Sequence, residues 1–388
     1  MAILMSLGIS LAFGDRIISS LRKLQVGETV RDLGLDGQKE KEGTPTMGGL
    51  MILISILIPA LLFAKLDNVY IQLLLFATVW FAGIGFLDDR LKILRKNKEG
   101  LRGKYKILGQ VIAGLIVALV MLMHKDIVVR MPAQEAEKMG WEITRSFPVT
   151  VPQLNKAPTE VQMAYAKAPI TNVPFFKSNE LDYSIFVNKN LNLIWLIFVP
   201  VVIFIITGVS NAANLTDGLD GLLTGIAAII GATLAVLGWV SSNAIVAGYL
   251  DILFIPNSQE LVIYSAGFIG ATIGFLWYNS YPASVFMGDT GSLMIGGVIA
   301  VIAVMLRKEI LIPILCGILF IESLSVILQV SYFKYTKKRT GTGQRIFLMS
   351  PLHHHYQKKG WHEMKIVIRF WIVAILLAVL TVITLKLR

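Results

Sequence analysis

Acidic side chains in this 388-residue chain occur where long apolar runs begin or end. Asp88 and Asp89 are adjacent in FLDDRLK, and Asp289 follows a glycine in FMGDTGS. Adjacent carboxylates repel one another unless a cation or a proton intervenes, so the pair indicates a divalent metal or a basic role. Amides at a helix start bind phosphate, and one carboxylate there could hold Mg²⁺ against it. We therefore expect Asp289 to be a metal ligand, with Phe286 able to stack on a base.

A second polar segment, SNAANLTDGLDGL, lies between two strongly apolar runs. It contains Asn211, Asn214, Asp217 and Asp220, whose amide and carboxylate groups can hydrogen-bond the edges of a sugar or a base. Gly218 lets the backbone approach a bound group closely. Ionisable residues at membrane depth are costly and mark a functional site by default.

Two basic segments complete the chemical inventory. Lys41 and Thr46 lie in KEGTPTMGG, where glycines, hydroxyls and a cation at a helix start suit an anion. His353, His354 and His355 lie in SPLHHHYQKKG. Consecutive side chains do not converge on one metal, so a basic loop that contacts a diphosphate fits better than a zinc site. The sequence has no P-loop or Rossmann glycine pattern, so ATP hydrolysis and NAD use are not indicated.

The composition places these segments in a membrane protein. Hydrophobic residues make up 55% of the chain and charged residues 16%, and the mean hydropathy is +0.68. The net charge of +11 lies largely beside apolar runs, where basic residues mark cytoplasmic loops, so no nucleic-acid partner is expected. The single cysteine, Cys316, excludes an intrachain disulfide.

Apolar windows predict about ten transmembrane helices in one all-α polytopic domain that covers residues 1–388. The expected spans are 1–19, 46–64, 69–87, 107–124, 191–210, 221–240, 261–279, 292–307, 311–333 and 366–386. The first is short and could instead be a signal peptide, although no basic segment precedes it and no cleavage site follows.

Lysine and arginine are dense in loops 20–45, 88–106 and 334–365. The positive-inside rule makes these loops cytoplasmic, and an even number of spans then puts both termini in the periplasm. The segment 125–190 has six prolines and no sustained apolar period, so we expect a periplasmic loop or insertion. Almost every polar cluster then falls on the cytoplasmic side of the inner membrane.

Five segments occur in the order GTPTMGG, FLDDRLK, NAANLTDGLDGL, FMGDTGSL and PLHHHY. In this order the chain resembles the phospho-N-acetylmuramoyl-pentapeptide-transferase family of the polyprenyl-phosphate hexose-1-phosphate transferases. The resemblance implies transfer of phospho-MurNAc-pentapeptide from UDP to undecaprenyl phosphate with Mg²⁺, giving lipid I and UMP in peptidoglycan synthesis. It leaves the oligomeric state open, a homodimer included.

The resemblance also implies residue roles. Asp88 would act on the lipid phosphate with Asp89 beside it, Asp289 would bind Mg²⁺, and Lys92 would lie near the diphosphate. His354 would belong with the catalytic residues. The implied substrate-binding residues are Lys41, Thr46, Asn211, Asn214, Asp217, Gly218, Asp220, Phe286, His353 and His355. The chain departs from the family before GTPTMGG, where Gly34, Leu35 and Gln38 replace a Gly-Pro pair and a histidine.

Several alternatives stay open at this point. Direct attack by the lipid phosphate is our hypothesis, and a covalent aspartyl-phosphate on Asp88 or Asp89 is the rival. A related transferase that moves GlcNAc-1-phosphate would share the acidic motifs but not GTPTMGG and PLHHHY. A secondary transporter would place its acids near the midplane and show internal repeats, which this sequence lacks. A scaffolding protein would not need so many carboxylates on one face.

Overall fold

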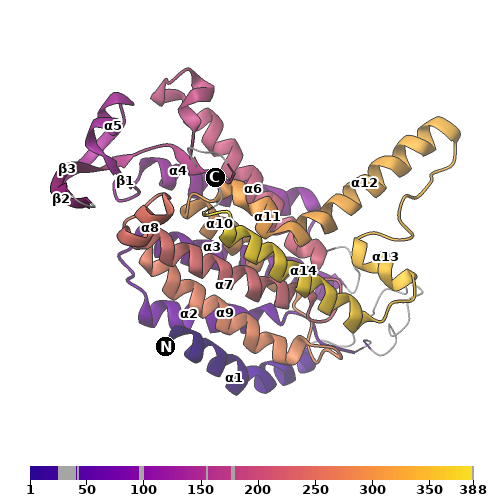
Figure 1. Cartoon of the computed structure of the whole chain (residues 1–388). Coiled ribbons are helices and arrows are strands. Elements are labelled where there is room, and N and C mark those ends of the chain that lie inside the picture. Colours follow the sequence, from indigo (N-terminus) through magenta and orange to yellow (C-terminus); the bar gives the residue numbers. More distant parts are fainter. Residues whose placement is uncertain (25–40, 42, 96–99, 154–155, 176–179, 387–388) are drawn as a thin grey trace.

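The computed structural model describes residues 1–24, 41, 43–95, 100–153, 156–175 and 180–386, and Figure 1 shows a bundle of long helices. Within these residues nine helices are long and apolar enough to cross a membrane, and the shorter apolar helix α2 makes a tenth. The bundle comprises α1 (Ala2–Leu24), α2 (Gly49–Phe63), α3 (Val69–Arg95), α4 (Gly103–Met123), α6 (Trp195–Thr216), α7 (Leu222–Ser242), α9 (Gln259–Asn279), α10 (Gly288–Met305), α12 (Gly317–Thr340) and α14 (Glu363–Ile383). The prediction of an all-α polytopic protein is confirmed.

The helix ends differ from the predicted spans in three places that matter. α3 continues two turns beyond residue 87, because Asp88 and Lys92 pair one turn apart along the helix. α10 begins at Gly288 rather than at 292, which puts Asp289 in its first turn. The predicted span 311–333 is broken into η4 (Glu309–Leu311), α11 (Ile312–Leu315) and α12, which extends away from the bundle at the upper right of Figure 1.

Helix α10 forms the centre of the bundle and is buried from Thr290 to Met305. Small residues allow its neighbours to approach closely. A Cβ at Gly296 would lie 2.7 Å from the Val209 carbonyl oxygen on α6, and one at Gly297 would lie 2.4 Å from the Phe81 ring on α3. This packing sets the start of α10 against the end of α3.

The segment 125–190 folds into a small β subdomain with one short helix, α5 (Ala133–Lys138). Strands β1 (Val129–Pro132), β2 (Glu142–Gln153) and β3 (Lys156–Lys167) form an antiparallel sheet in the order β1-β3-β2, and β4 (Ile170–Asn172) pairs with β5 (Glu180–Asp182). The 3₁₀ turns η2 (Tyr183–Val187) and η3 (Leu191–Leu193) lead into α6. Strand β4 contacts the chain just after α10, because the Asn172 backbone amide donates to the Arg307 carbonyl at 3.0 Å.

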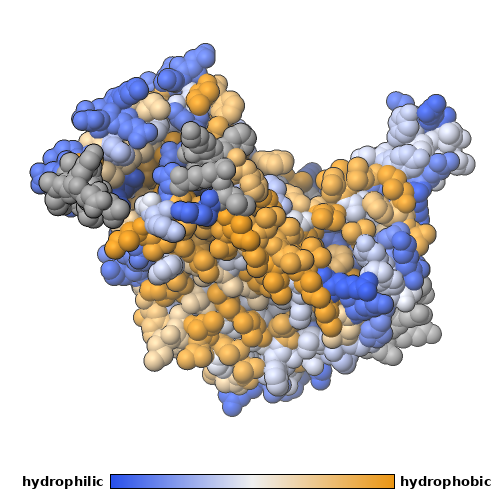
Figure 2. Space-filling view, in the orientation of Figure 1, coloured by the Kyte–Doolittle hydropathy of each residue, from blue (hydrophilic) through white to orange (hydrophobic). Residues whose placement is uncertain are grey.

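We call the end of the bundle that holds Asp289 the site face and the opposite end the far face. Both termini lie toward the far face, since Lys386 donates to the Tyr249 carbonyl in α8 (Ala244–Leu250), which follows the far end of α7. Gly14, later in α1, packs on Tyr278 near the site face. Figure 2 shows a broad apolar band between the polar β subdomain and the polar site face. This arrangement agrees with an even number of crossings.

Candidate active site

Three carboxylates meet where α3 ends and α10 begins. One oxygen each from Asp88, Asp89 and Asp289 lies within 4.8 Å of the others. Two glycines, which have no side chain, allow the backbones to come this close. A Cβ at Gly85 would lie 2.1 Å from the Asp289 carbonyl oxygen, and one at Gly288, which has a φ of 72°, would lie 2.6 Å from Asp89 Oδ2. We call Asp88, Asp89 and Asp289 the carboxylate cluster.

Two lysines neutralise much of this negative charge. Lys92 Nζ lies 2.6 Å from Asp88 Oδ2 and 3.3 Å from Asp289 Oδ1. Lys106, from the first turn of α4, places Nζ 3.0 Å from Asp88 Oδ1 and also bonds to the Asp289 carboxylate. Both lysines are partly shielded from solvent, so these attractions are stronger than at an exposed surface. Two lysine ammonium groups therefore lie against the carboxylates of the cluster.

Asp88 and Asp89 make different contacts although they are adjacent. Asp89 caps α10, since it accepts hydrogen bonds from the amides of Asp289 and Thr290, at 3.1 and 2.9 Å, and from the Thr290 hydroxyl. Asp88 instead accepts from the Leu101 amide at 2.6 Å and faces the two lysines. Asp89 is thus bonded to the start of helix α10, and Asp88 is held by the Leu101 amide and the two lysine side chains.

The amides of α6 divide between two places. Asn214 donates to Asp289 Oδ1 and to Ser292 Oγ, both at 2.9 Å, and so belongs to the surroundings of the carboxylate cluster. Asn211 lies almost one turn deeper and donates to Gln110 Oε1 on α4 at 2.8 Å. The structure therefore brings Asn214 to the carboxylates and places Asn211 between α4 and α6.

Asp217 follows the last residue of α6 and lies close to the same acids. The pKa of Asp217 is raised to about 8, chiefly by burial and also by the charges of Asp289, Asp89 and Asp220, while the charge of Lys92 opposes them. A carboxyl group with this pKa is largely protonated at neutral pH, so Asp217 can donate as well as accept a hydrogen bond. This is a property that the sequence alone did not indicate.

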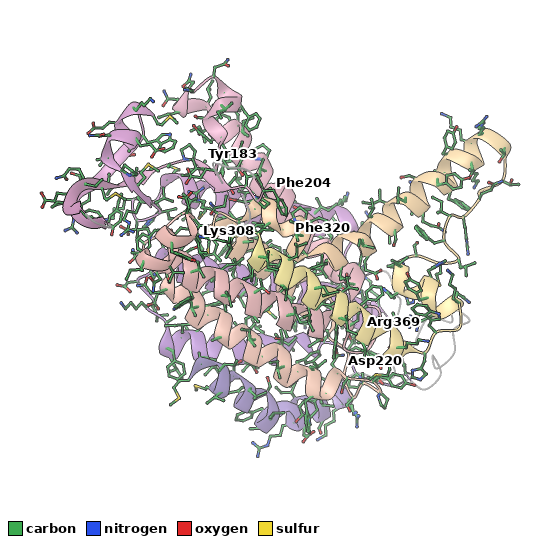
Figure 3. All side chains as sticks on the ribbon, in the orientation of Figure 1. Tyr183, Phe204, Asp220, Lys308, Phe320 and Arg369 are labelled. Atoms are coloured by element: carbon green, nitrogen blue, oxygen red, sulfur yellow. The ribbon has the colours of Figure 1, made fainter. Side chains whose placement is uncertain are left out.

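A second ion cluster, the Lys41 triad, lies beside the first on the site face. Lys41 Nζ lies 2.6 Å from Asp220 Oδ1 and 2.6 Å from Glu363 Oε1 at the start of α14. Burial lowers the pKa of Lys41, but the two carboxylates outweigh burial and the pKa is raised overall. Figure 3 shows Asp220 at the end of the bundle near Arg369, far from Lys308. The triad joins the segment before α2, the α6–α7 loop and α14.

The three consecutive histidines point to three different partners. His353, which is buried, places Nδ1 3.1 Å from Glu322 Oε2 on α12, and its Nε2 faces Gly218, where a Cβ would lie 2.2 Å away. His354 contacts Gln357 within α13 (Leu352–Lys358). His355 accepts from the Leu348 amide. The three side chains thus have different hydrogen-bond partners, while the rings of His353 and His354 pack edge to face with their centres 4.2 Å apart.

The pKa of His354 is lowered to about 4, chiefly by burial and also by the nearby His353 and Lys41, while its hydrogen bond with Gln357 opposes them. Its imidazole is therefore neutral at neutral pH. The contact between His353 and Gly218, two residues before Asp220, also places the α13 segment near the Lys41 triad. The histidine run and the triad thus belong to one face of the molecule.

Thr46 and Phe286 lie where the chain before α2 meets the chain before α10. The Phe286 amide donates to the Pro45 carbonyl at 2.8 Å, and the Gly48 amide donates to the Phe286 carbonyl at 2.9 Å. The Thr46 hydroxyl lies 2.9 Å from where a Cβ at Gly288 would be. These contacts bring both predicted residues next to the carboxylate cluster, with Phe286 half-buried. Gly34, Leu35 and Gln38 lie outside the described residues.

The structure adds residues that the sequence analysis missed. Lys106 is the most important of these residues. The one sequence feature that could have identified it is its position in the first turn of an apolar run, where a lysine is costly. Glu363 pairs with Lys41, which lies more than a hundred positions earlier in the chain, and Glu322 on α12 pairs with His353 on α13. Nothing in the local sequence of either glutamate predicts its partner. Tertiary packing alone brings them to the site.

The donor set of the carboxylate cluster fits a divalent metal ion. Three carboxylates offer hard oxygen ligands, the type that Mg²⁺ and Ca²⁺ take. Two lysine ammonium groups now contact these same oxygens. A lysine ammonium already balances the carboxylate oxygens that it contacts. If a metal ion replaced that lysine at the carboxylates, their buried charge would still be paired.

Comparison with known proteins gives the family. The glycosyl transferase family 4 model matches residues 71–307, and signature 1 of phospho-N-acetylmuramoyl-pentapeptide-transferase matches residues 41–53. A phospho-N-acetylmuramoyl-pentapeptide-transferase of Flavobacterium psychrophilum is 57% identical over all of this chain and 93% of its own length. Relatives of the same description from Parabacteroides distasonis and Flavobacterium johnsoniae are 52% and 54% identical, again over the whole chain and 93% of their own length. This chain, whose carboxylates and lysines converge at one end of a membrane helix bundle, belongs to the phospho-N-acetylmuramoyl-pentapeptide-transferase family.

Proposed function

We propose that this chain transfers phospho-MurNAc-pentapeptide from UDP-MurNAc-pentapeptide to undecaprenyl phosphate, producing lipid I and UMP. This is the first membrane step of peptidoglycan synthesis. The observation that carries the proposal is the convergence of Asp88, Asp89 and Asp289 with Lys92 and Lys106 at one end of an apolar bundle. Phosphoryl transfer needs little covalent chemistry from a protein and depends on positioning and charge stabilisation, which such a cluster provides.

The carboxylate cluster would hold Mg²⁺, with Asp289 as the principal ligand. When bound, the ion would supply positive charge to the diphosphate and to the leaving UMP. The chain contributes cations of its own, because Lys92 and Lys106 can turn from the acids toward phosphate oxygens. Asn214, held by Asp289 and Ser292, fixes the orientation of the Asp289 carboxylate.

Asp88 is the residue we assign to the lipid phosphate. A phosphate monoester has a second pKa of about 6, so the attacking group is already largely dianionic at neutral pH. Asp88 therefore aligns the acceptor through the lysines more than it removes a proton. Asp89 holds α10 in place through its capping bonds.

We favour direct attack of the lipid phosphate on the diphosphate. A covalent aspartyl-phosphate is the rival path, and radiolabelled phospho-sugar trapped on Asp88 or Asp89 after denaturation would establish it. Asp88 is the better placed of the two for that role as well, because the oxygens of Asp89 accept from α10.

The nucleotide and sugar side would lie between the Lys41 triad and α13. Asp217, protonated at neutral pH, offers a donor to a sugar or a base, and Phe286 offers an aromatic face. Asn211, whose amide nitrogen donates to Gln110 and Thr207, would contribute its carbonyl oxygen as an acceptor. His353 and His354 line the approach from α13, with Gly218 leaving room beside His353. His355 and Thr46 complete the set that we assign to substrate binding.

The acceptor would arrive from the bilayer and the nucleotide from water. A polyprenyl chain can lie along apolar helices while its phosphate reaches the charged rim, so the enzyme needs a groove and not a pore. We place the site face on the cytoplasmic side of the bacterial inner membrane, with both termini and the 125–190 insertion in the periplasm. A homodimer is compatible with this arrangement.

An assay of the purified protein with UDP-MurNAc-pentapeptide, undecaprenyl phosphate and MgCl₂ tests the proposal. Wild type should form lipid I and release UMP, and UDP-GlcNAc should be a poor donor. Asp289→Asn should lower kcat by roughly 100-fold or more, as loss of a group that stabilises transition-state charge does. Asp126→Asn, at an exposed position on the far face, is the matched control. No lipid I from wild type would end the proposal, and full activity of Asp289→Asn would end the metal assignment.

A further inference from the structure

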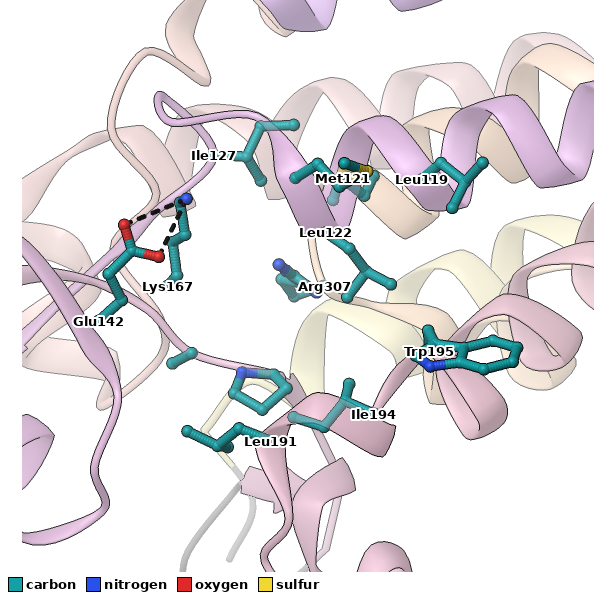
Figure 4. A pocket seen from close by; sticks show the side chains of 13 residues that line it. Leu119, Met121, Leu122, Ile127, Glu142, Lys167, Leu191, Ile194, Trp195 and Arg307 are labelled. Carbon is teal, nitrogen blue, oxygen red and sulfur yellow. Dashed lines mark hydrogen bonds and ion pairs between the residues drawn. The ribbon is translucent and has the colours of Figure 1, made fainter.

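A cavity lies at the far face, between the β subdomain and the ends of α4 and α10. Its volume is about 410 Å³, within the range of roughly 300 to 1,000 Å³ that is usual for small-molecule sites. Figure 4 shows Arg307 pointing into it, with the Lys167 and Glu142 pair nearby. The carboxylate cluster is at the other end of α10, so this cavity is separate from the proposed active site.

Arg307 is the only arginine among the residues that line the cavity in the described part of the chain, and it is 5% exposed. Its Nη1 atom is buried without a hydrogen-bond partner, and none of the ion pairs found among the described residues includes Arg307. The guanidinium instead lies 5.5 Å from the centre of the Phe198 ring. A buried cation with an unsatisfied donor is costly unless something outside the protein completes it.

The nearest acid in sequence does not complete the pair. Glu309 uses Oε2 to accept a hydrogen bond from the Thr171 hydroxyl. At the rim, Lys167 Nζ lies 3.1 Å from Glu142 Oε2, so these two charges cancel. Among the described residues that line the cavity, Arg307 is then the one charge without an ion-pair partner; Glu309 attracts it from outside the lining, and the unpartnered Nη1 donor points to an acceptor such as an anion.

The rest of the lining is apolar. Leu119, Leu122 and Met123 come from α4, and Ile194 and Trp195 from the start of α6. Trp195 is 53% exposed at the end of a membrane helix, the position where tryptophan marks the membrane interface. An apolar wall at this depth suits a hydrocarbon chain that enters from the bilayer.

We propose that this cavity binds one anionic phospholipid of the far-face leaflet, with its phosphate on Arg307 and part of an acyl chain along α4 and α6. A planar guanidinium can donate two parallel hydrogen bonds to a phosphate, which gives both affinity and orientation. Occupation would satisfy Arg307 Nη1 and cover the apolar wall. The lipid would also tie the β subdomain to the bundle, because Ala168 and Pro169 of the connection after β3 line the same cavity.

Native mass spectrometry of the full-length protein after delipidation tests this site. Phosphatidylglycerol should be retained in preference to phosphatidylcholine. Arg307→Gln should weaken phosphatidylglycerol retention by about tenfold, the effect of losing a charge-assisted pair of hydrogen bonds. Arg130→Gln is the matched control, because Arg130 lies at the same face and stacks on Phe254 outside the cavity. Its retention of lipid should equal that of wild type.

A second variant guards against misfolding of Arg307→Gln. Leu122→Trp keeps the arginine and fills the cavity from α4, so it should also reduce retention. Equal retention of phosphatidylglycerol by wild type and both variants would overturn the proposal. Equal retention of phosphatidylglycerol and phosphatidylcholine by wild type would show that the cavity does not recognise an anion, and would also overturn the proposal. Displacement of the lipid by millimolar inorganic phosphate would assign the arginine to a soluble anion and overturn the lipid assignment.

Discussion

Lys106 on α4 forms an ion pair with Asp88 on α3, with Nζ 3.0 Å from Oδ1. The same ammonium bonds to Asp289 on α10, so one side chain connects three helices at the candidate active site. The pairing closes the carboxylate cluster on the side of α4. It also explains how two buried acids are tolerated at the end of a membrane helix, since paired charges escape most of the cost of burial.

Replacement of Lys106 should lower activity more than stability. Lys106→Met removes a cation that can turn toward phosphate, and kcat should fall by roughly 100-fold. Lys104→Met is the matched control, because Lys104 is exposed and its ammonium lies over the neighbouring Tyr105 ring, 5.1 Å from the ring centre. Lipid I formation measured for both variants decides the matter. Similar rates for Lys106→Met and Lys104→Met would contradict the role of Lys106.

Close packing of α3 on α10 should be sensitive to one methyl group. Gly85→Ala would place a Cβ 2.1 Å from the Asp289 carbonyl oxygen, so α10 must shift. Overpacking of this kind costs about 1–3 kcal/mol, and the shift should also reduce activity. Gly83→Ala, two positions earlier, should be neutral or slightly stabilising, because a Cβ at Gly83 would have no neighbouring atom within 4 Å among the described residues. Thermal unfolding in detergent compares the two, and equal midpoints would argue against tight contact at Gly85.

The Lys41 triad should contribute to stability. Lys41→Met leaves the Asp220 and Glu363 carboxylates facing each other without a cation, at a cost on the order of 3 kcal/mol. The double variant Lys41→Met/Glu363→Gln removes one of those charges and should recover part of the loss. Lys65→Met, at an exposed lysine, is the control. A double variant no more stable than Lys41→Met would show that charge repulsion is not the cause.

The far face should make stability depend on pH through Lys308. Burial lowers the pKa of Lys308 from its ordinary 10.5 to about 7, against the charges of Glu309 and Glu180, which raise it. Between these two pH values the unfolded chain holds a proton that the folded chain has lost, so the free energy of unfolding rises with pH across this window. Below pH 7 both states are protonated and this contribution is constant.

Lys308→Met should remove that part of the pH dependence. Unfolding midpoints of wild type and Lys308→Met should be measured from pH 6 to pH 9.5. The difference between the two midpoints should be largest at low pH and should shrink as the pH rises. The wild type should gain stability as the pH rises, and the variant should show a smaller gain. Lys167→Met, at the same face, should keep the wild-type slope. A variant with the slope of wild type would rule out Lys308 as its source.

The amino-acid sequence by itself determined the membrane class, the number of apolar helices and the segments that hold the acids, amides and histidines. These features depend on local chain properties, because transfer of an apolar run into lipid is a sum over neighbouring residues. The predicted spans 69–87 and 292–307 nevertheless missed the turns of α3 and α10 that carry Asp88 and Asp289, since ion pairs and capping bonds extend those helices.

Only the tertiary structure decided which charges meet. The distinction between Asp88 and Asp89 arises because one faces two lysines and the other caps α10. Lys106 and Glu363 entered the site through contacts between helices, and the sheet in 125–190 formed through pairing of distant strands. Coulombic attraction and hydrogen bonding act over a few ångströms, and the separations at that scale are set by helix packing that no local pattern encodes.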